Sequence, residues 1–196
     1  MVADFMANGN GMNVKELVSL LATHVGEATD WVHEYMGVAY NMEEGLHVLA
    51  EYQKDRELAY KDGGHGFAAS ARAALEKSGV TIYLQTKAQQ LLTDGHGTVV
   101  GVKAIEESGK THLLHASSVI LTTGGYGNNP NLLNDKLNKV LYYGTKSSTG
   151  DGILMATTPE LNAATRLMAY GKIYPNGVEV SKGHAKSTIG GNLAVL

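Results

Sequence analysis

Glycine clusters constrain the fold of this chain more than any other feature of its sequence. The 196 residues include 24 glycines, and many of these fall in four short clusters at 63–66, 95–97, 124–127 and 150–152. Glycine adopts left-handed backbone conformations at little cost, and it lets backbone N–H groups approach a ligand closely. Each cluster therefore predicts either a tight turn or a loop that contacts a ligand.

The overall composition indicates a single globular domain, or one domain with an appendage. Hydrophobic residues make up 43% of the chain and the formal net charge is −3, so a nucleic-acid partner is not expected. The absence of cysteine excludes disulfides, iron–sulfur ligation and thiol catalysis. No apolar run approaches the roughly 18 residues of a membrane span, and the first residues lack a basic signal-peptide region. We therefore expect a cytoplasmic protein without a membrane span.

Two helices are predicted in the first part of the chain. Apolar residues at helical spacing indicate an amphipathic helix over 13–36, with Asn13 and Glu16 placed as a capping box. A glycine-rich turn at 61–66 precedes an alanine-rich helix over 67–77. Because alanine favours helix and permits close packing, we expect this second helix to lie against a sheet.

A meander of three or four antiparallel strands is predicted over 79–117, because short apolar segments alternate there with glycine-containing turns. Its expected strands contain the alternating residues Val80, Ile82 and Leu84 and the segments 88–92, 99–105 and 113–115. The run that follows, 118–122, is almost continuously apolar. This pattern predicts a buried strand of a parallel sheet.

Two glycine-rich loops come next. Residues 123–125 follow the predicted strand, where missing side chains allow backbone N–H groups to reach a phosphate or an adenine edge. Residues 149–152 open a predicted helix at 153–157, and Asp151 adds a carboxylate that can accept hydrogen bonds from sugar hydroxyls. Structural turns explain these features as well as a ligand site does. Two such loops around one segment favour a nucleotide cofactor.

Other familiar motifs are absent from the sequence. Gly9 and Gly11 begin a pattern like the dinucleotide-binding fingerprint, but Val14 occupies the third glycine position and no strand precedes it. The eight histidines are not spaced as metal ligands, and no G-x-S-x-G nucleophile motif occurs. The sequence therefore indicates no metal site and no catalytic residue of its own.

Three ordered blocks in the sequence resemble the FAD-binding domain shared by fumarate reductase and succinate dehydrogenase flavoproteins, with their fumarate, urocanate and ketosteroid-oxidising relatives. These blocks are GVTIYLQTKAQQLLTDGHGTVVGVKAI, ASSVILTTGGYGNN and STGDGILMA, at 79–105, 116–129 and 148–156. Their order and spacing are similar to the family's from about Asn13 to Ala156. Each block alone is a weak indicator of this family, whereas the three blocks in this order are specific for it.

The resemblance implies an α/β fold with α+β features, namely a partial Rossmann-like FAD-binding domain with an antiparallel β-meander. It assigns 1–158 to this domain, without the family's N-terminal βαβ unit, and 159–196 to the start of a capping-domain region or an irregular tail. The chain is thus expected to be an internal fragment, with FAD as the cofactor of the parent protein. FAD binding by the fragment alone is expected to be weak or absent.

The resemblance also implies a set of cofactor-binding residues. The backbone at Ala88 would meet the adenine, and Thr123, Gly124 and Gly125 would line the adenosine and pyrophosphate end. Thr149, Gly150 and Asp151 would bear on the sugar and phosphate portion, and Gly64 and His65 fall in a loop that approaches the flavin in relatives.

The implied function is part of a flavin-dependent oxidoreductase that reduces or forms a carbon–carbon double bond. A small-molecule substrate would be bound by the capping domain that the fragment lacks, and the resemblance leaves the electron donor unassigned. Whether this chain is itself an enzyme stays open, and the fragment alone is expected to be inactive. The alternative is a non-catalytic domain of the same fold that acts in assembly without a bound cofactor.

Overall fold

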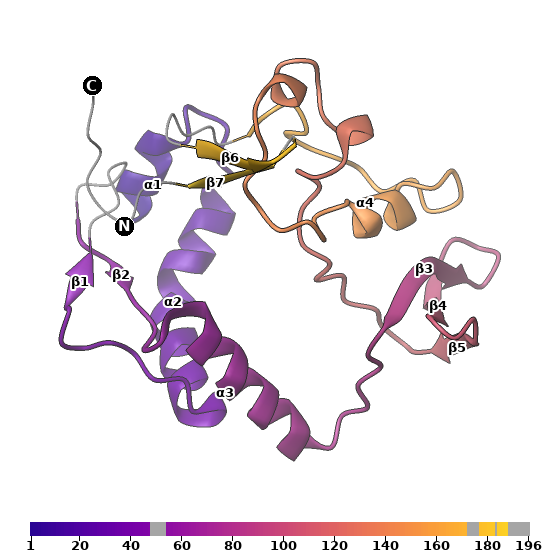
Figure 1. Cartoon of the computed structure of the whole chain (residues 1–196), viewed down its shortest axis with the longest axis horizontal. Helices are drawn as coiled ribbons and strands as arrows, with labels where there is room; N and C mark the ends of the chain where they lie inside the picture. The colour runs from indigo at the N-terminus through magenta and orange to yellow at the C-terminus, as the bar shows by residue number, and fades with distance from the viewer. Residues whose placement is uncertain (48–53, 172–176, 183, 188–196) are drawn as a thin grey trace. The chain divides into compact units, whose positions relative to one another are not determined.

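The computed structural model describes residues 1–47, 54–171, 177–182 and 184–187. The chain divides into two units, Met1–Ile82 and Tyr83–Leu196 (Figure 1). None of the described helices is long and apolar enough to cross a membrane.

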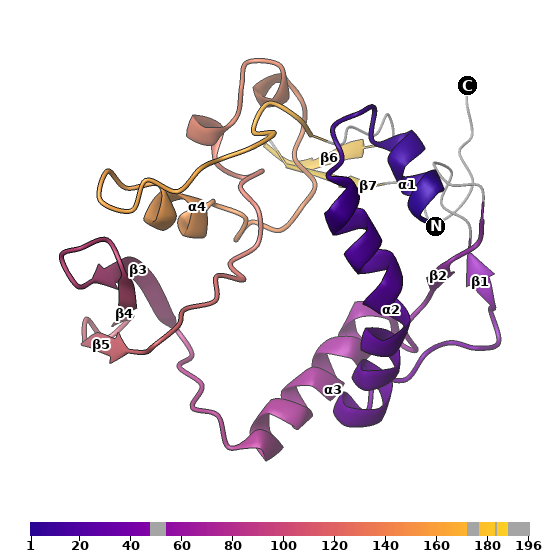
Figure 2. The same ribbon diagram turned by 180° about the vertical axis from the view of Figure 1, so that it is seen from behind.

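The unit Met1–Ile82 is mainly helical. Its described elements are α1 (Val2–Asn8), α2 (Lys15–Met36), β1 (Leu46–His47), β2 (Glu57–Leu58) and α3 (Gly63–Ser78). The helices α2 and α3 pack together, as both ribbon views show (Figures 1 and 2). Helix α2 ends where Gly37 adopts the left-handed conformation, with φ +71°, that glycine tolerates best.

Both predicted helices are present, but each begins elsewhere than the sequence suggested. Asn13 does not cap α2, because its side-chain amide donates to the Phe5 carbonyl oxygen at 3.2 Å and so ties α2 to the preceding helix. Gly64 and His65 do not form a turn, as predicted, but lie in the first turn of α3. The turn ends at Asp62, the residue directly before the first residue of α3. Its φ of +62° directs the chain into the helix.

The predicted meander is confirmed as a three-stranded antiparallel sheet in the unit Tyr83–Leu196. Its strands are β3 (Thr86–Thr93), β4 (Val99–Glu106) and β5 (Thr111–His115), in the order β3-β4-β5. The Asp94 carboxylate stabilises the first turn by accepting hydrogen bonds from the backbone N–H groups of His96 and Thr98. Leu91 and Ala104 are the buried apolar residues of this sheet.

The alternating segment before β3 was predicted to be a strand, and this prediction was wrong. Gln85 has a φ of +50°, which breaks the extended conformation directly before Thr86. The alternating apolar side chains are therefore not paired into the sheet and remain exposed, namely Val80, Ile82 and Leu84.

The strand predicted over 118–122 is also not formed. This segment continues from β5, but it pairs with no strand in the described part of the chain, and Ile120 is 86% exposed. An apolar run becomes a buried strand only where neighbouring strands supply hydrogen-bond partners and cover its faces.

The rest of this unit contains short elements. These are η1 (Pro130–Leu132), η2 (Leu137–Lys139), α4 (Asp151–Ala156), β6 (Gly177–Ser181) and β7 (His184–Ser187). Helix α4 lies against β3 (Figures 1 and 2), and it begins within the second glycine-rich loop. The described part of 159–196 includes the antiparallel hairpin β6–β7, whereas 172–176, 183 and 188–196 lie outside the described residues. The assignment of this stretch to a capping domain stays a prediction.

Candidate cofactor site

The two glycine-rich loops of the sequence lie side by side. The Gly150 N–H donates to the Gly125 carbonyl oxygen at 3.0 Å, and the Asn128 N–H donates to the Ser148 carbonyl oxygen at 2.9 Å. These backbone bonds join residues that are 25 and 20 positions apart in the chain. The loops therefore form one structure at the start of α4.

Glycine is required at two positions of this structure. Gly150 has a φ of +76° and is buried against Tyr126, whose Cβ a side chain at position 150 would meet at 3.0 Å. Gly152 is buried in α4, where an added Cβ would overlap the hydroxyl of Thr123. The absence of side chains thus allows α4 to approach the loop 123–125.

The loop 123–125 exposes unused backbone donors. Thr123, Gly124 and Gly125 are exposed, and their N–H groups donate to no acceptor among the described residues. Gly124 adopts a φ of +76°, a conformation that side-chain-bearing residues rarely take. Exposed N–H groups without side-chain cover can donate to an anionic ligand.

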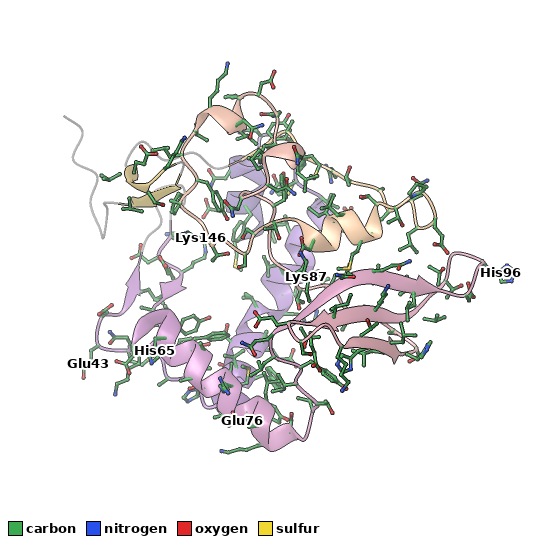
Figure 3. The ribbon with its side chains drawn as sticks, turned by 45° about the vertical axis from the view of Figure 1, so that its right-hand side comes forward. Glu43, His65, Glu76, Lys87, His96 and Lys146 are labelled. Carbon is green, nitrogen blue, oxygen red and sulfur yellow. The ribbon has the colours of Figure 1, made fainter. Side chains whose placement is uncertain are left out.

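Asp151 is held from two directions at the start of α4. Its Oδ1 accepts a hydrogen bond from the Thr149 hydroxyl at 3.0 Å, and its Oδ2 lies 3.1 Å from the Nζ of Lys87 on β3. Figure 3 shows Lys87 on β3 beside this helix. The Lys87 ammonium and the Thr149 hydroxyl hold the pKa of the Asp151 carboxyl below its usual value. Asp151 is therefore ionised at neutral pH.

A pocket of about 630 Å³ lies between β3 and α4. Its lining includes Lys87, Ala88, Gln89, Asp151, Met155 and Glu160. Strand β3 is bulged between Ala88 and Gln90, so Gln89 is an additional residue without a partner on β4. The bulge lies at the pocket, since Ala88, Gln89 and Gln90 all line it together with Asp151.

A second pocket of about 470 Å³ lies on the other face of α4. Thr123, Gly124 and Gly152 line it, together with Ile153. Predicted residues of this unit therefore line pockets on two faces of one short helix, with Asp151 and Ala88 at the first pocket and Thr123 and Gly124 at the second.

The remaining predicted residues belong to the other unit. Gly64 and His65 are exposed in the first turn of α3 in Met1–Ile82, where Figure 3 labels His65. Their participation in a site stays a prediction.

Sequence reasoning missed Lys87, Gln89 and Glu160, which share the pocket with Asp151. No local pattern pairs Lys87 with Asp151, because these residues are far apart in the chain and meet only when α4 packs on β3. A lysine next to the predicted adenine contact at Ala88 was the only available signal.

The chain matches the family model described as FAD binding domain over residues 1–186. Among curated proteins, it is 24% identical to a probable fumarate reductase of Shewanella frigidimarina over 100% of this chain and 33% of the relative. It is 27% identical to a urocanate reductase of Eggerthella lenta over 89% of this chain and 29% of the relative. The chain thus spans about a third of the length of these relatives.

Solved structures show the same similarity. The open conformation of a flavocytochrome c3 fumarate reductase matches 80% of this chain and 28% of its own, with a TM-score of 0.73 and 25% identity. A 3-ketosteroid-Δ4-(5α)-dehydrogenase of Rhodococcus jostii shares the fold over 84% of this chain and 40% of its own, with a TM-score of 0.67 and 21% identity. The mixed helical and antiparallel fold expected from the sequence is confirmed by these flavoprotein neighbours. From the match over 1–186 and this shared fold, the chain belongs to the FAD binding domain family.

Proposed function

We propose that this chain supplies part of the FAD cradle of a flavin-dependent oxidoreductase of the fumarate reductase type, which reduces or forms a carbon–carbon double bond. One observation carries the proposal: the loops at 123–125 and 149–151 are bonded to each other, beside an ionised Asp151. FAD, when bound, supplies the redox chemistry, and the protein's share is to bind and orient it.

The residues present fit the chemical groups of FAD. Exposed N–H groups at 123–125 are suited to pyrophosphate oxygens, and the Asp151 carboxylate is suited to a sugar hydroxyl donor. The pocket beside Ala88 has an apolar floor that includes the buried residues Leu91 and Met155. Such a floor is suited to a flat base.

The proposed cofactor residues are those expected from the sequence. On β3 and the two loops they are Ala88, Thr123, Gly124, Gly125, Thr149, Gly150 and Asp151, and in the other unit they are Gly64 and His65. The proposal includes a partial FAD-binding domain over 1–158 and a capping region that begins within 159–196. A small-molecule substrate would be bound by that capping region, and the electron donor is left unassigned. A cytoplasmic location belongs to the same proposal, and fractionation of the producing cells tests it.

The proposal is tested by amide NMR of the 196-residue chain titrated with FAD, ADP and riboflavin at up to millimolar concentration. The adenosine and pyrophosphate contacts should make FAD and ADP shift the amides of 123–125 and 149–151. Riboflavin, which lacks the adenosine diphosphate portion, should leave these amides unshifted. No response to FAD and ADP, or an equal response to riboflavin, would contradict the proposed cradle.

A further inference from the structure

Lys87 connects the meander to the proposed cofactor loop. Its Nζ lies 3.1 Å from Asp151 Oδ2, so a residue of β3 determines where a carboxylate of α4 lies. The cofactor residues expected from the sequence do not include this lysine, although it lines the pocket beside Asp151. We propose that Lys87 is a positioning residue for FAD, which acts by holding the Asp151 carboxylate in the orientation that accepts a cofactor hydroxyl. This inference rests on the proposed function.

The geometry leaves Asp151 able to accept a further hydrogen bond. One oxygen accepts from Thr149 and the other from Lys87, so the two partners fix the rotation of the carboxylate. An ionised carboxylate has about four acceptor positions on its two oxygens. Acceptor positions on both oxygens therefore stay available to a ligand while the group is held in place.

The ion pair contributes little to the stability of the fold. The Lys87 side chain is 66% exposed and that of Asp151 is 33% exposed. Solvent screens ion pairs in such surroundings, so they contribute little to the stability of a protein. Loss of Lys87 should therefore alter the position and ionisation of Asp151 without unfolding the chain.

The charged side chains of the pocket show which groups face Asp151. Lys87 from β3 and Glu160 from the segment after α4 are the charged side chains that line the pocket with Asp151 in the described residues. Glu160 accepts a hydrogen bond from Thr93 at the far end of β3. Lys87 is therefore the cation that pairs with Asp151 among the described residues that line this pocket.

The experiment compares Lys87→Met, Lys87→Gln and Lys87→Arg in the 196-residue chain, with Lys103→Met on the neighbouring strand β4 as a matched control. Carbon-13 NMR gives the pKa of Asp151 without any cofactor, and amide shifts give the FAD affinity from pH 7 down to about pH 3, below the ordinary pKa of an aspartate. Asp151→Asn and the double variant Lys87→Met/Asp151→Asn complete a double-mutant cycle.

Removal of the lysine should raise the pKa of Asp151 toward its ordinary value of about 4 and weaken FAD by up to about fivefold at pH 7. Protonation of Asp151 removes the acceptor, so affinity falls as the pH drops through its pKa. Lys87→Met should move this fall to higher pH, whereas Lys87→Arg and Lys103→Met should match the wild type. The double variant should bind no worse than Asp151→Asn, because Lys87 acts through Asp151.

Three results would overturn the inference, and they have different meanings. An unchanged Asp151 pKa and FAD profile in Lys87→Met, alongside a loss in Asp151→Asn, would refute the role of Lys87 and leave the proposed function standing. Additive losses in the double variant would show that Lys87 binds FAD directly instead. A wild-type chain that does not respond to FAD would overturn the proposed function and this inference with it.

Discussion

Asp151 can be a helix cap or a cofactor ligand, and these roles predict different behaviour for Asp151→Asn. The structure gives its carboxylate Thr149 and Lys87 as partners, while Gly150 occupies the N-cap position. We expect Asp151→Asn to weaken FAD by about 1.5–3 kcal/mol, the value of a hydrogen bond to a charged group. The melting temperature of the cofactor-free protein should barely change. Calorimetric melting and FAD titration of both proteins measure the two quantities.

The control for this substitution is Asp94→Asn, in the turn between β3 and β4. Asp94 accepts hydrogen bonds from two backbone N–H groups, which lower the pKa of its carboxyl. Asp94→Asn should weaken the hydrogen bonds of this turn and leave the affinity for FAD unchanged. If Asp151→Asn and the wild type bind FAD equally, Asp151 has no cofactor role.

Glu106 makes the stability of the meander dependent on pH. His112 lies 2.6 Å from its Oε1 and Ser108 donates to its Oε2, and these contacts lower the pKa of Glu106. A carboxyl whose pKa is lower in the folded state stabilises the fold above its unfolded pKa. That contribution is lost as the pH falls through the folded pKa.

We therefore expect Glu106→Gln to lower the melting temperature at pH 7 and to remove part of the fall in stability between about pH 5 and pH 3. Melting curves recorded across this range measure the effect. Glu107→Gln, the adjacent exposed turn residue, is the matched control. Parallel pH profiles for Glu106→Gln and the wild type would show that the pair with His112 contributes nothing.

At the scale of elements, α4 and the loop 123–125 depend on a glycine contact. Because a Cβ at Gly152 would overlap the Thr123 hydroxyl, Gly152→Ala should destabilise the protein by about 1–3 kcal/mol, as overpacking does. The same contact predicts that Gly152→Ala no longer destabilises the protein when Thr123 is also replaced by alanine. There the clash is removed, and alanine's helix propensity should make Gly152→Ala neutral or stabilising by up to about 1 kcal/mol.

Thermal unfolding of the two single variants and the double variant measures this coupling. Additive effects in the double variant would show that α4 and the loop do not pack as described. Gly26→Ala in α2 is a useful comparison, because a Cβ there meets nothing within 4 Å.

At the scale of the whole molecule, the chain spans about a third of its relatives and has a small core. Among the described residues, the buried apolar ones are Val38, Leu91, Ala104, Leu137 and Met155. The G-x-G-x-x-G fingerprint that binds dinucleotide phosphates does not occur in these 196 residues. Loss of two or three charge-assisted contacts, at roughly 1.5–3 kcal/mol each, weakens binding by about a thousandfold or more.

We therefore expect FAD to dissociate from the 196-residue chain during gel filtration, although millimolar FAD binds in solution. The ratio of flavin absorbance to protein in the eluted peak measures retention. Stoichiometric flavin in that peak would contradict the prediction and would mean that the described loops hold FAD without further segments.

The sequence by itself determined the features that depend on neighbouring residues. Short apolar segments separated by glycine-containing turns predicted the meander, and the order of three blocks identified the family. The glycine-rich residues 149–152 predicted a helix at 153–157, and in the structure this helix already begins at Asp151. Each of these is local, because backbone conformation and hydrogen bonding within a turn depend on residues only a few positions apart.

The tertiary structure alone decided which distant residues meet. The contact of Lys87 with Asp151 and the fit of Gly152 against Thr123 arise from packing of α4, which no pattern of spacing encodes. Packing and pairing also explain the run 118–122, whose apolar composition predicts a buried strand but which has no strand partner in the described part of the chain. An apolar composition shows that a segment is suited to burial, but the segment is buried only where neighbouring elements cover it in the folded structure.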